Sequence, residues 1–316
     1  MNLLSDMLEE LPFSSEELCD LIATAQYRYK VYSIPKRQKG QFRTIAQPSP
    51  EIKLLQHWLM KRIFSHLPVH KVATAYCEGK SIADHATQHA PNRFLLKMDF
   101  KDFFHSISAV DVLRYLIEFR KFPLEDAKLI TSIVCWRNKS VGRLCLSIGA
   151  PSSPILSNAL LYAFDKKVVQ LCQPLKVKYS RYADDLAFST NKKNVLIDIS
   201  KQIQLICDEL DYPKLEVNHK KTVSTSRAFR RVLVGLILTP DGKVSLGREK
   251  KRRLRTQLYL FSKNRLDISD IPKLRGELAF AWSVESVFIQ TLLKQLGEDV
   301  FRQLDLPFSL NSDDLT

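Results

Sequence analysis

In the N-terminal third of the chain, hydrophobic positions repeat at helical spacing in two segments. In the stretch between these two segments, hydrophobic and polar positions follow a strand pattern instead. Ser14 and Glu17 form a capping-box pattern at the start of the first helical segment, and residues 51–67 form the second. Between the two, residues 32–50 follow a strand pattern around a basic loop, with Gly40 at the turn. The pattern therefore predicts a helix, a pair of strands and a second helix, in this order.

The central part of the chain begins with an almost continuous apolar run, residues 93–100, which is typical of a buried strand and places Asp99 at its end. Two short apolar segments flank Asp184 and Asp185 and predict a hairpin. Six of the remaining segments have helical periodicity, and two short apolar segments on either side of a turn form a strand pair. Helices are expected within 111–122, 124–136, 149–172, 197–210, 248–264 and 271–297, and a last strand pair at 230–238 and 243–247.

Composition adds a strong positive charge to this picture. The 316 residues include 48 Lys and Arg against 34 Asp and Glu, a net charge of +14, with 45% hydrophobic residues. A folded protein with two or three subdomains and a polyanionic partner is expected, with nucleic acid as the first candidate and an anionic membrane surface as the second. No apolar run approaches the ~20 residues that span a bilayer. The N-terminal residues lack a signal-peptide layout, and the six scattered cysteines indicate reduced thiols in the cytoplasm.

The adjacent aspartates at the hairpin are the clearest candidates for chemistry. Two like charges side by side in a buried segment repel each other unless a cation lies between them. Mg²⁺ is bound by oxygen ligands and would remove this repulsion. If the two strands are neighbours, Asp99 supplies a third carboxylate to Asp184 and Asp185, as in two-metal phosphoryl transfer. The alternative is a pair of solvated turn residues.

Several segments, taken in order, resemble the successive palm motifs of reverse transcriptases. They are LLKMDFKDFFHSI, GAPSSPILSNALL, YSRYADDLAFST, LEVNHKKT and RRVLVGLIL. The resemblance covers roughly residues 25–290 and is greatest to the bacterial retron reverse transcriptases, through FRTIAQPS, SIADHATQH and LRGELAFAWSVES. The retron-associated Asn-Ala-x-x-His pattern departs at its first position, His85, and the Val-Thr-Gly pattern departs at two positions of 233–235.

The resemblance implies an α+β right-hand polymerase fold, with fingers, a palm whose antiparallel sheet packs on helices, and a helical thumb. Residues 1–92 would form the N-terminal helix and fingers, and 93–244 the palm, with a fingers insertion at about 107–145. Residues 245–316 would form a basic, helical thumb.

The same resemblance implies an RNA-directed DNA polymerase that uses deoxynucleoside triphosphates and two Mg²⁺ ions. A structured non-coding RNA would serve as template and primer. The product would be branched, RNA-linked multicopy single-stranded DNA (msDNA) that starts at a guanosine 2′-OH and forms an RNA–DNA hybrid. The resemblance also implies a role in anti-phage defence in the bacterial cytoplasm. The protein would act there together with an effector protein, and no membrane partner is expected. The alternatives are a group II intron-like or diversity-generating reverse transcriptase and a non-catalytic RNA-binding scaffold; an RNA-dependent RNA polymerase is disfavoured by Phe104.

Carried over residue by residue, the family pattern makes Asp99, Asp184 and Asp185 the metal ligands and Lys221 the acid that protonates departing pyrophosphate. The neighbouring lysine leaves the register of Lys221 open. Phe104 matches the aromatic gate that rejects a ribose 2′-OH, with a plain core phenylalanine as the alternative. The sites of nucleotide contact would further include Arg43, Asp102, Gly149, Ala150 and Pro151.

Arg43 would grip the triphosphate, and Gly149, Ala150 and Pro151 would lie under the incoming base; Ile148 stands where many reverse transcriptases have Gln. Asp102 would lie in the turn at the triphosphate or cap the next helix. Nucleic-acid contacts are expected from Lys36, Lys39, His89, Arg248, Lys250, Lys251, Arg252 and Arg253. For these residues the alternatives are surface charge, a solvated helix face and, for the loop before residue 152, a simple helix start.

Overall fold

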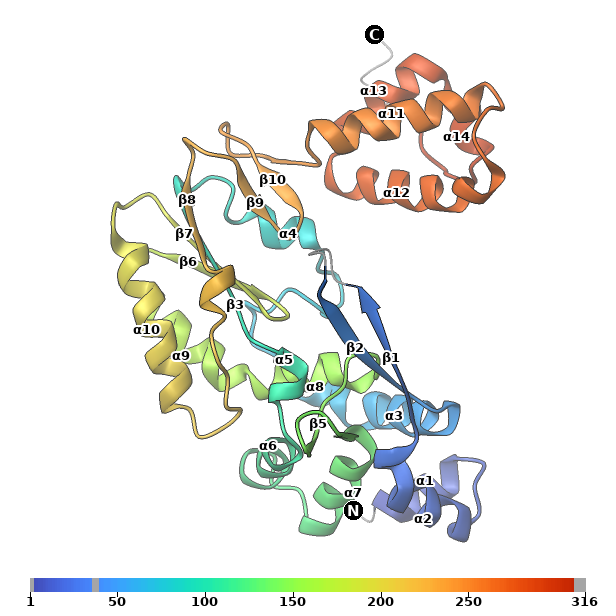
Figure 1. Ribbon diagram of the computed structural model, residues 1–316, viewed down its shortest axis with the longest axis vertical. Coiled ribbons are helices and arrows are strands. Elements are labelled where there is room, and N and C mark those ends of the chain that lie inside the picture. The colour runs from blue at the N-terminus through green and yellow to red at the C-terminus, as the bar shows by residue number, and fades with distance from the viewer. Residues whose placement is uncertain (1–2, 36–39, 310–316) are drawn as a thin grey trace.

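Helices and antiparallel strands alternate along the chain, as the hydrophobic pattern predicts (Figure 1). The computed structural model describes residues 3–35 and 40–309, so that Lys36 and Lys39 lie outside the described residues. The helices are α1 Leu3–Glu10, α2 Ser15–Thr24, α3 Pro50–Arg62, α4 Ile82–Thr87, α5 Phe103–Ser106, α6 Ala109–Arg114, α7 Leu124–Val134, α8 Ser152–Leu160, α9 Tyr162–Cys172, α10 Val195–Glu209, α11 Arg248–Ser262, α12 Ile271–Val284, α13 Ser286–Leu296 and α14 Glu298–Arg302. The strands are β1 Tyr29–Pro35, β2 Phe42–Pro48, β3 Phe94–Asp99, β4 Trp136–Asn138, β5 Arg143–Cys145, β6 Lys178–Tyr182, β7 Asp185–Thr190, β8 Val223–Ser226, β9 Arg231–Leu233, β10 Leu236–Leu238 and β11 Val244–Ser245.

Short 3₁₀ and π-helical turns complete the described chain. The 3₁₀ turns are Ala25–Tyr27, Phe64–His66, His219–Lys221 and Ile268–Asp270, and a π-helical turn, Tyr115–Phe119, extends α6. The predicted capping box at α2 is confirmed, because Ser14 accepts a hydrogen bond from the amide of Glu17 while the Glu17 carboxylate accepts one from the amide of Ser14.

The central sheet has four antiparallel strands in the order β6-β7-β3-β8. Strands β6 and β7 form the predicted hairpin, and β3 lies beside β7 although nearly ninety residues separate them in the chain. The register places Asp99 opposite Asp185 and Leu96 opposite Phe188. The strand that the sequence predicts before residue 100 therefore ends next to the hairpin tip.

Alternate residues of this sheet enter two different hydrophobic cores. Leu96 and Phe188 point into the larger core, which also contains residues of α9 and α10, the helices beside the sheet in Figure 1. Leu95 and Ala187 point the other way, into a second core with α4, β9, β10 and the C-terminal helices. Because neighbouring residues of a strand face opposite sides, both faces of the sheet are covered and its near-continuous apolar sequence is explained.

Two expected elements are divided in the structure. The segment 230–238, expected as one strand, is a hairpin of β9 and β10, because Val234 and Gly235 both adopt positive φ angles, 45° and 82°. Two successive residues with positive φ form the tight turn that suits a two-residue hairpin. The long helix expected within 149–172 is interrupted at Leu161, whose ψ of 2° departs from the helical value.

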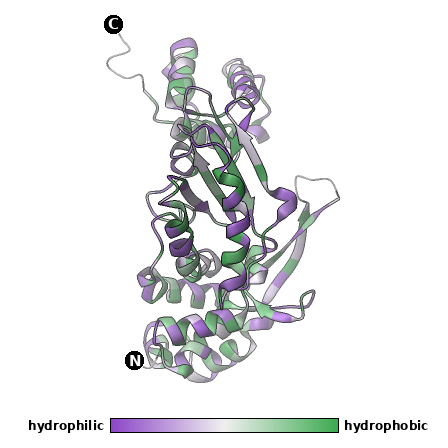
Figure 2. Ribbon diagram, turned by 90° about the vertical axis from the view of Figure 1, so that its left-hand side faces the viewer, coloured by the Kyte–Doolittle hydropathy of each residue, from purple (hydrophilic) through white to green (hydrophobic). Residues whose placement is uncertain are grey.

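Helices α11 to α14 form a separate group at the C-terminal end of the described chain (Figure 1). Leu254 and Leu258 of α11 and Leu274 and Leu278 of α12 are buried between the helices. Figure 2 shows hydrophobic and hydrophilic residues alternating around these and the other helices, as expected for helices with one buried face. No helix in residues 3–35 and 40–309 is long and apolar enough to span a membrane.

Candidate active site

Three aspartates lie in the region where β3 ends and the β6–β7 hairpin turns. Asp99 is the last residue of β3, Asp185 is the first residue of β7 and faces it across the sheet, and Asp184 lies in the turn. Burial and the charges of Asp184 and Asp99 raise the pKa of Asp185 to about 6. Burial, followed by the charge of Asp99, also raises the pKa of Asp184. The three acids therefore form one electrostatically strained group, as expected if the strands are neighbours.

Lys221 supplies a positive charge to this group. Its Nζ donates hydrogen bonds to both carboxylate oxygens of Asp99, at 2.8 and 2.9 Å. Burial opposes the charge on Lys221, but its hydrogen bond to Asp99 and the three negative charges raise its pKa overall. Lys221 is thus a lysine that contacts the carboxylates, and its role as the acid that protonates pyrophosphate stays a prediction.

The chemistry of the three side chains fits a hard divalent cation. Carboxylate oxygens are the ligands that Mg²⁺ prefers. Burial, followed by the charges of the neighbouring carboxylates, raises the pKa values of Asp184 and Asp185, and a bound cation would offset both effects. In the described part of the chain, no three His, Cys, Asp or Glu side chains stand close enough together to form a ready metal centre. Lys221 instead neutralises Asp99 in this arrangement.

Arg43 and Tyr76 approach the carboxylates from the N-terminal part of the chain. Arg43 is exposed on β2, and its charge lowers the pKa of Asp184 against the effect of burial. Tyr76 has a positive φ of 58°, and burial together with the charge of Asp184 raises its pKa, while Arg43 opposes this shift. Sequence analysis missed Tyr76, because an aromatic residue in an irregular segment carries no periodic signal.

The loop before α8 packs directly against the strand that carries Arg43. The carbonyl of Ile148 accepts a hydrogen bond from the amide of Ala46 at 2.9 Å. Gly149 has a φ of +116°, and a Cβ atom there would lie 3.1 Å from the carbonyl oxygen of Ala46. The positive φ therefore favours glycine, and a Cβ atom would also force β2 to shift slightly. Ala150 is buried and Pro151 immediately precedes the first residue of α8, so the loop is also the start of a helix.

Asp102 and Phe104 lie just beyond the end of β3. Asp102 is exposed and left-handed, with a φ of 42°, and its side chain makes no capping hydrogen bond to α5, so the alternative in which it caps the next helix is not observed. Phe104 is half-buried and packs against the larger core, with its ring centroid 5.2 Å from that of Phe103. Phe103 itself is a buried core residue. Because Phe104 is partly exposed, it could contact a nucleotide, and its role as a gate stays a prediction.

The prediction that His89 contacts nucleic acid is wrong, because its side chain is fully buried. Its Nδ1 and Nε2 atoms lie 2.7 Å from the hydroxyls of Ser189 and Ser180, respectively. His85 is also fully buried, with Nδ1 2.8 Å from the Ser180 hydroxyl. The serines occupy the face of β6 and β7 that is turned toward α4, so the two histidines bind α4 to the central sheet.

Part of the basic run in α11 is directed toward neighbouring helices. Lys251 forms an ion pair of 2.6 Å with Glu285, and Arg253 forms one of 2.6 Å with Glu277. The ammonium of Lys250 lies 4.1 Å from the ring centroid of Phe280. These contacts reduce the charge that the run offers to a polyanion. The side chains of Arg248 and Arg252 are exposed.

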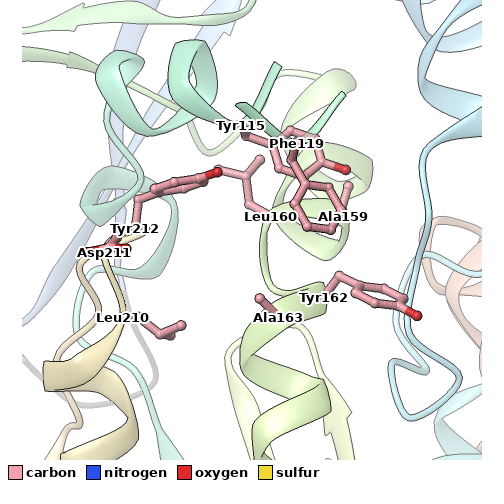
Figure 3. A pocket seen from close by; sticks show the side chains of 9 residues that line it. All are labelled: Tyr115, Phe119, Ala159, Leu160, Tyr162, Ala163, Leu210, Asp211 and Tyr212. Carbon is pink, nitrogen blue, oxygen red and sulfur yellow. The ribbon is translucent and has the colours of Figure 1, made fainter. Parts of the chain in front are cut away.

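A cavity of about 180 Å³ lies elsewhere, beside the junction of α8 and α9 (Figure 3). Tyr115, Tyr162 and Tyr212 are among the side chains that line it, and Asp211 is its one carboxylate. None of the three clustered aspartates, nor Lys221 or Arg43, lines this cavity. The candidate active site therefore lies at the end of β3 and the β6–β7 turn, and this cavity is not part of it.

Comparisons with known proteins agree with the motif pattern. A family model described as reverse transcriptase (RNA-dependent DNA polymerase) matches residues 34–253. The Escherichia coli Retron Ec83 reverse transcriptase is 38% identical, over 87% of this chain and 89% of its own length. The Escherichia coli Retron Ec86 reverse transcriptase is 31% identical, over 95% and 92%. Among solved structures, telomerase from Candida tropicalis in complex with the TWJ fragment of telomeric RNA has a TM-score of 0.49 and 14% identity; the match covers 90% of this chain and 59% of that one.

Proposed function

This chain belongs to the retron reverse transcriptases, which are RNA-directed DNA polymerases with a right-hand polymerase fold, and we propose that it copies part of a structured non-coding RNA into msDNA. Synthesis would start from a guanosine 2′-OH of the same RNA and yield a branched, RNA-linked single-stranded DNA. The observation that carries the proposal is the register of β3 and β7, which brings Asp99 and Asp185 together beside Asp184.

In the proposed reaction, Asp99, Asp184 and Asp185 would hold two Mg²⁺ ions, in keeping with the general dependence of reverse transcriptases on divalent metals. Bound Mg²⁺ would neutralise the triphosphate and the departing pyrophosphate. The exposed guanidinium of Arg43, on the strand beside the site, binds the triphosphate because its planar fork matches two phosphate oxygens. The ammonium of Lys221, which donates to Asp99, then gives a proton to the pyrophosphate.

Two further contacts would select and support the nucleotide. Phe104, which is partly exposed beyond β3, would exclude a ribose 2′-OH. Gly149, Ala150 and Pro151 would lie under the incoming base, and the Gly149 backbone packs closely against β2. Asp102 lies in the left-handed turn whose backbone amides would face the triphosphate. Residues 1–92, 93–244 and 245–316 would serve as fingers, palm and thumb, with 107–145 as a fingers insertion.

The proposed partners are the structured RNA, its RNA–DNA hybrid product and an effector protein in anti-phage defence, in the bacterial cytoplasm. A net charge of +14 supports a polyanionic partner, and the exposed Arg248 and Arg252 of α11 would contact its phosphates. Sequencing the RNA that co-purifies with the protein separates this proposal from an intron-like or diversity-generating enzyme. Purified nucleic acid treated with RNase and debranching enzyme should contain a short DNA of discrete length.

The catalytic proposal is tested with Asp184→Asn on a poly(rA)/oligo(dT) substrate in Mg²⁺. We expect synthesis to fall by at least about a hundredfold, because the substitution removes a charged ligand without changing the side-chain shape. Asp198→Asn, at an exposed acid of α10, is the matched control and should keep wild-type activity. Undiminished synthesis by a folded Asp184→Asn protein would refute the metal-ligand role, and inactive wild type would favour the non-catalytic scaffold.

A further inference from the structure

Arg181 is fully buried under the hairpin that carries the aspartates. It lies on β6, with no exposed side-chain area, and its Nη2 atom forms an ion pair of 2.7 Å with Asp165 of α9, which is equally buried. The Nε atom of Arg181 donates to the same carboxylate at 3.0 Å, and the Tyr179 hydroxyl donates to it at 2.7 Å. Nη1 donates to the side-chain oxygen of Asn158 on α8 at 2.9 Å. The guanidinium is thus held rigidly by two helices.

The same guanidinium also reaches the turn that contains Asp184. Its Nη1 atom donates to the carbonyl oxygen of Ala183 at 3.0 Å. Ala183 has a φ of +56°, a left-handed conformation that a residue with a Cβ adopts only where its surroundings hold it. Ala183 directly precedes Asp184, so the direction of the Asp184 side chain depends on the conformation that this hydrogen bond supports.

A second chain of hydrogen bonds runs from Arg181 to the segment that carries Tyr76. The carbonyl of Arg181 accepts hydrogen bonds from the amide and hydroxyl of Thr74, at 2.8 and 2.9 Å. The side-chain amide of Asn158, whose oxygen accepts from Arg181, donates to the carbonyl of Ala75 at 2.8 Å. Residues 74 and 75 are therefore anchored by the main-chain carbonyl of Arg181 and by the side chain of Asn158, which also accepts a hydrogen bond from the Arg181 guanidinium.

We propose that Arg181 is a positioning residue for DNA synthesis: it fixes the Asp184 turn and the Tyr76 segment relative to each other, through Ala183 and Asn158. The inference rests on the proposed role of Asp184 as a metal ligand. Lysine cannot replace arginine here, because one ammonium cannot reach the Asp165 carboxylate, Asn158 and the Ala183 carbonyl in the directions that the planar fork serves. A misplacement of about 1 Å at a reacting group can cost about a hundredfold in rate.

Arg181→Lys is the test, and Arg231→Lys is its matched control. Arg231 is likewise buried, with 1% of its surface exposed, and it also donates to backbone carbonyls, at Asn92, Ala90 and Thr239. It supports the β9–β10 hairpin, and its guanidinium donates to backbone carbonyls rather than to the aspartates. The measurements are the melting temperature, kcat and KM for dTTP on poly(rA)/oligo(dT), and the Mg²⁺ concentration that gives half-maximal synthesis.

Both variants should melt at a lower temperature than wild type. Only Arg181→Lys should lower kcat, by about ten- to a hundredfold, and raise the half-maximal Mg²⁺ concentration several-fold, with KM for dTTP within about twofold of wild type. If Arg181→Lys changes kcat and the Mg²⁺ requirement no more than Arg231→Lys does, the residue is merely structural and the inference fails. If Asp184→Asn proves fully active, the proposed function itself fails instead.

A variant that keeps the buried ion pair guards against a failure of Arg181→Lys to fold. Asn158→Ser removes the acceptor of Arg181 and the donor to Ala75 but leaves Asp165 in place. We expect the same direction of change, with a smaller loss of kcat and a raised half-maximal Mg²⁺ concentration. A folded Asn158→Ser protein with wild-type kcat and Mg²⁺ dependence would overturn the inference.

Discussion

Acidification should destabilise the fold through the two histidines that bind α4 to the central sheet. Burial lowers the pKa of His85 to about 3, from an ordinary value of 6.5. Burial, with a further contribution from the charge of His85, also lowers the pKa of His89. The folded protein therefore keeps both imidazoles neutral, while the unfolded chain takes up protons below pH 6.5. The protein loses stability as the pH falls below the histidine pKa of the unfolded chain. The loss continues until the pH reaches the lower pKa of the folded state.

The magnitude follows from the proton uptake of the unfolded chain. At about pH 5.5 an unfolded histidine is protonated about ten to one, which favours unfolding by about 1.4 kcal/mol per buried histidine. If the pH fell to the folded-state pKa of His85, about 3, the free energy of unfolding would decrease by about 5 kcal/mol, because each pKa unit corresponds to about 1.4 kcal/mol. A change of 1 kcal/mol shifts the melting temperature of a large domain by about 2–4 °C.

The assay compares wild type with His85→Asn by thermal denaturation at about pH 7.5 and pH 5.5. Asparagine places an amide near the position of Nδ1, so Ser180 keeps a hydrogen-bonding partner while the titration is removed. The wild type should lose about 3–6 °C more than the variant over this interval. His66→Asn, at an exposed histidine, is the control and should behave as wild type. Equal losses in wild type and His85→Asn would refute the reasoning.

Three further predictions concern the site and the C-terminal helices. Gly149→Ala should lower kcat about tenfold, because its Cβ would press on the Ala46 carbonyl, whereas Gly276→Ala, in open space on α12, should keep kcat and melt no lower than wild type. Phe104→Ala should increase ribonucleotide incorporation in a competition assay; equal use of both sugars by the wild type would contradict the gate. Glu285→Gln removes the charge that accepts from the Ser245 hydroxyl, the amide after it and one lysine of α11, so hydrogen exchange over residues 245–251 should accelerate.

Much of the site could be predicted because its signals are local. The apolar run before Asp99, the hairpin pattern around Asp184 and Asp185 and the turn before α8 all depend on residues that are neighbours in the chain. The ordered motifs then allowed these segments to be assigned to one polymerase site. The structure adds the hydrogen bonds between Lys221 and Asp99, which distinguish this lysine from the one before it.

Other features were beyond the sequence because they depend on which face of an element meets a distant partner. His89 has the spacing of a surface helix residue, yet its two ring nitrogens meet serines from strands about a hundred residues away. Tyr76 approaches Asp184 from an irregular segment. Arg181 would pass for a surface charge in a short strand, and only the packing of α8 and α9 beneath the sheet supplies Asp165 and Asn158 as its partners.

The sequence alone determined the class of elements, the basic character of the chain and the identity of the carboxylates, because periodicity, net charge and motif order are properties of the chain itself. Tertiary structure decided which strand lies beside which, which charges are neutralised and which polar side chains are buried. The insertion of β3 between β7 and β8 turns separate acids into one strained group, and the same packing removes His89 from solvent. Side-chain environment is set by contacts between segments far apart in the chain, and local pattern carries no record of those contacts.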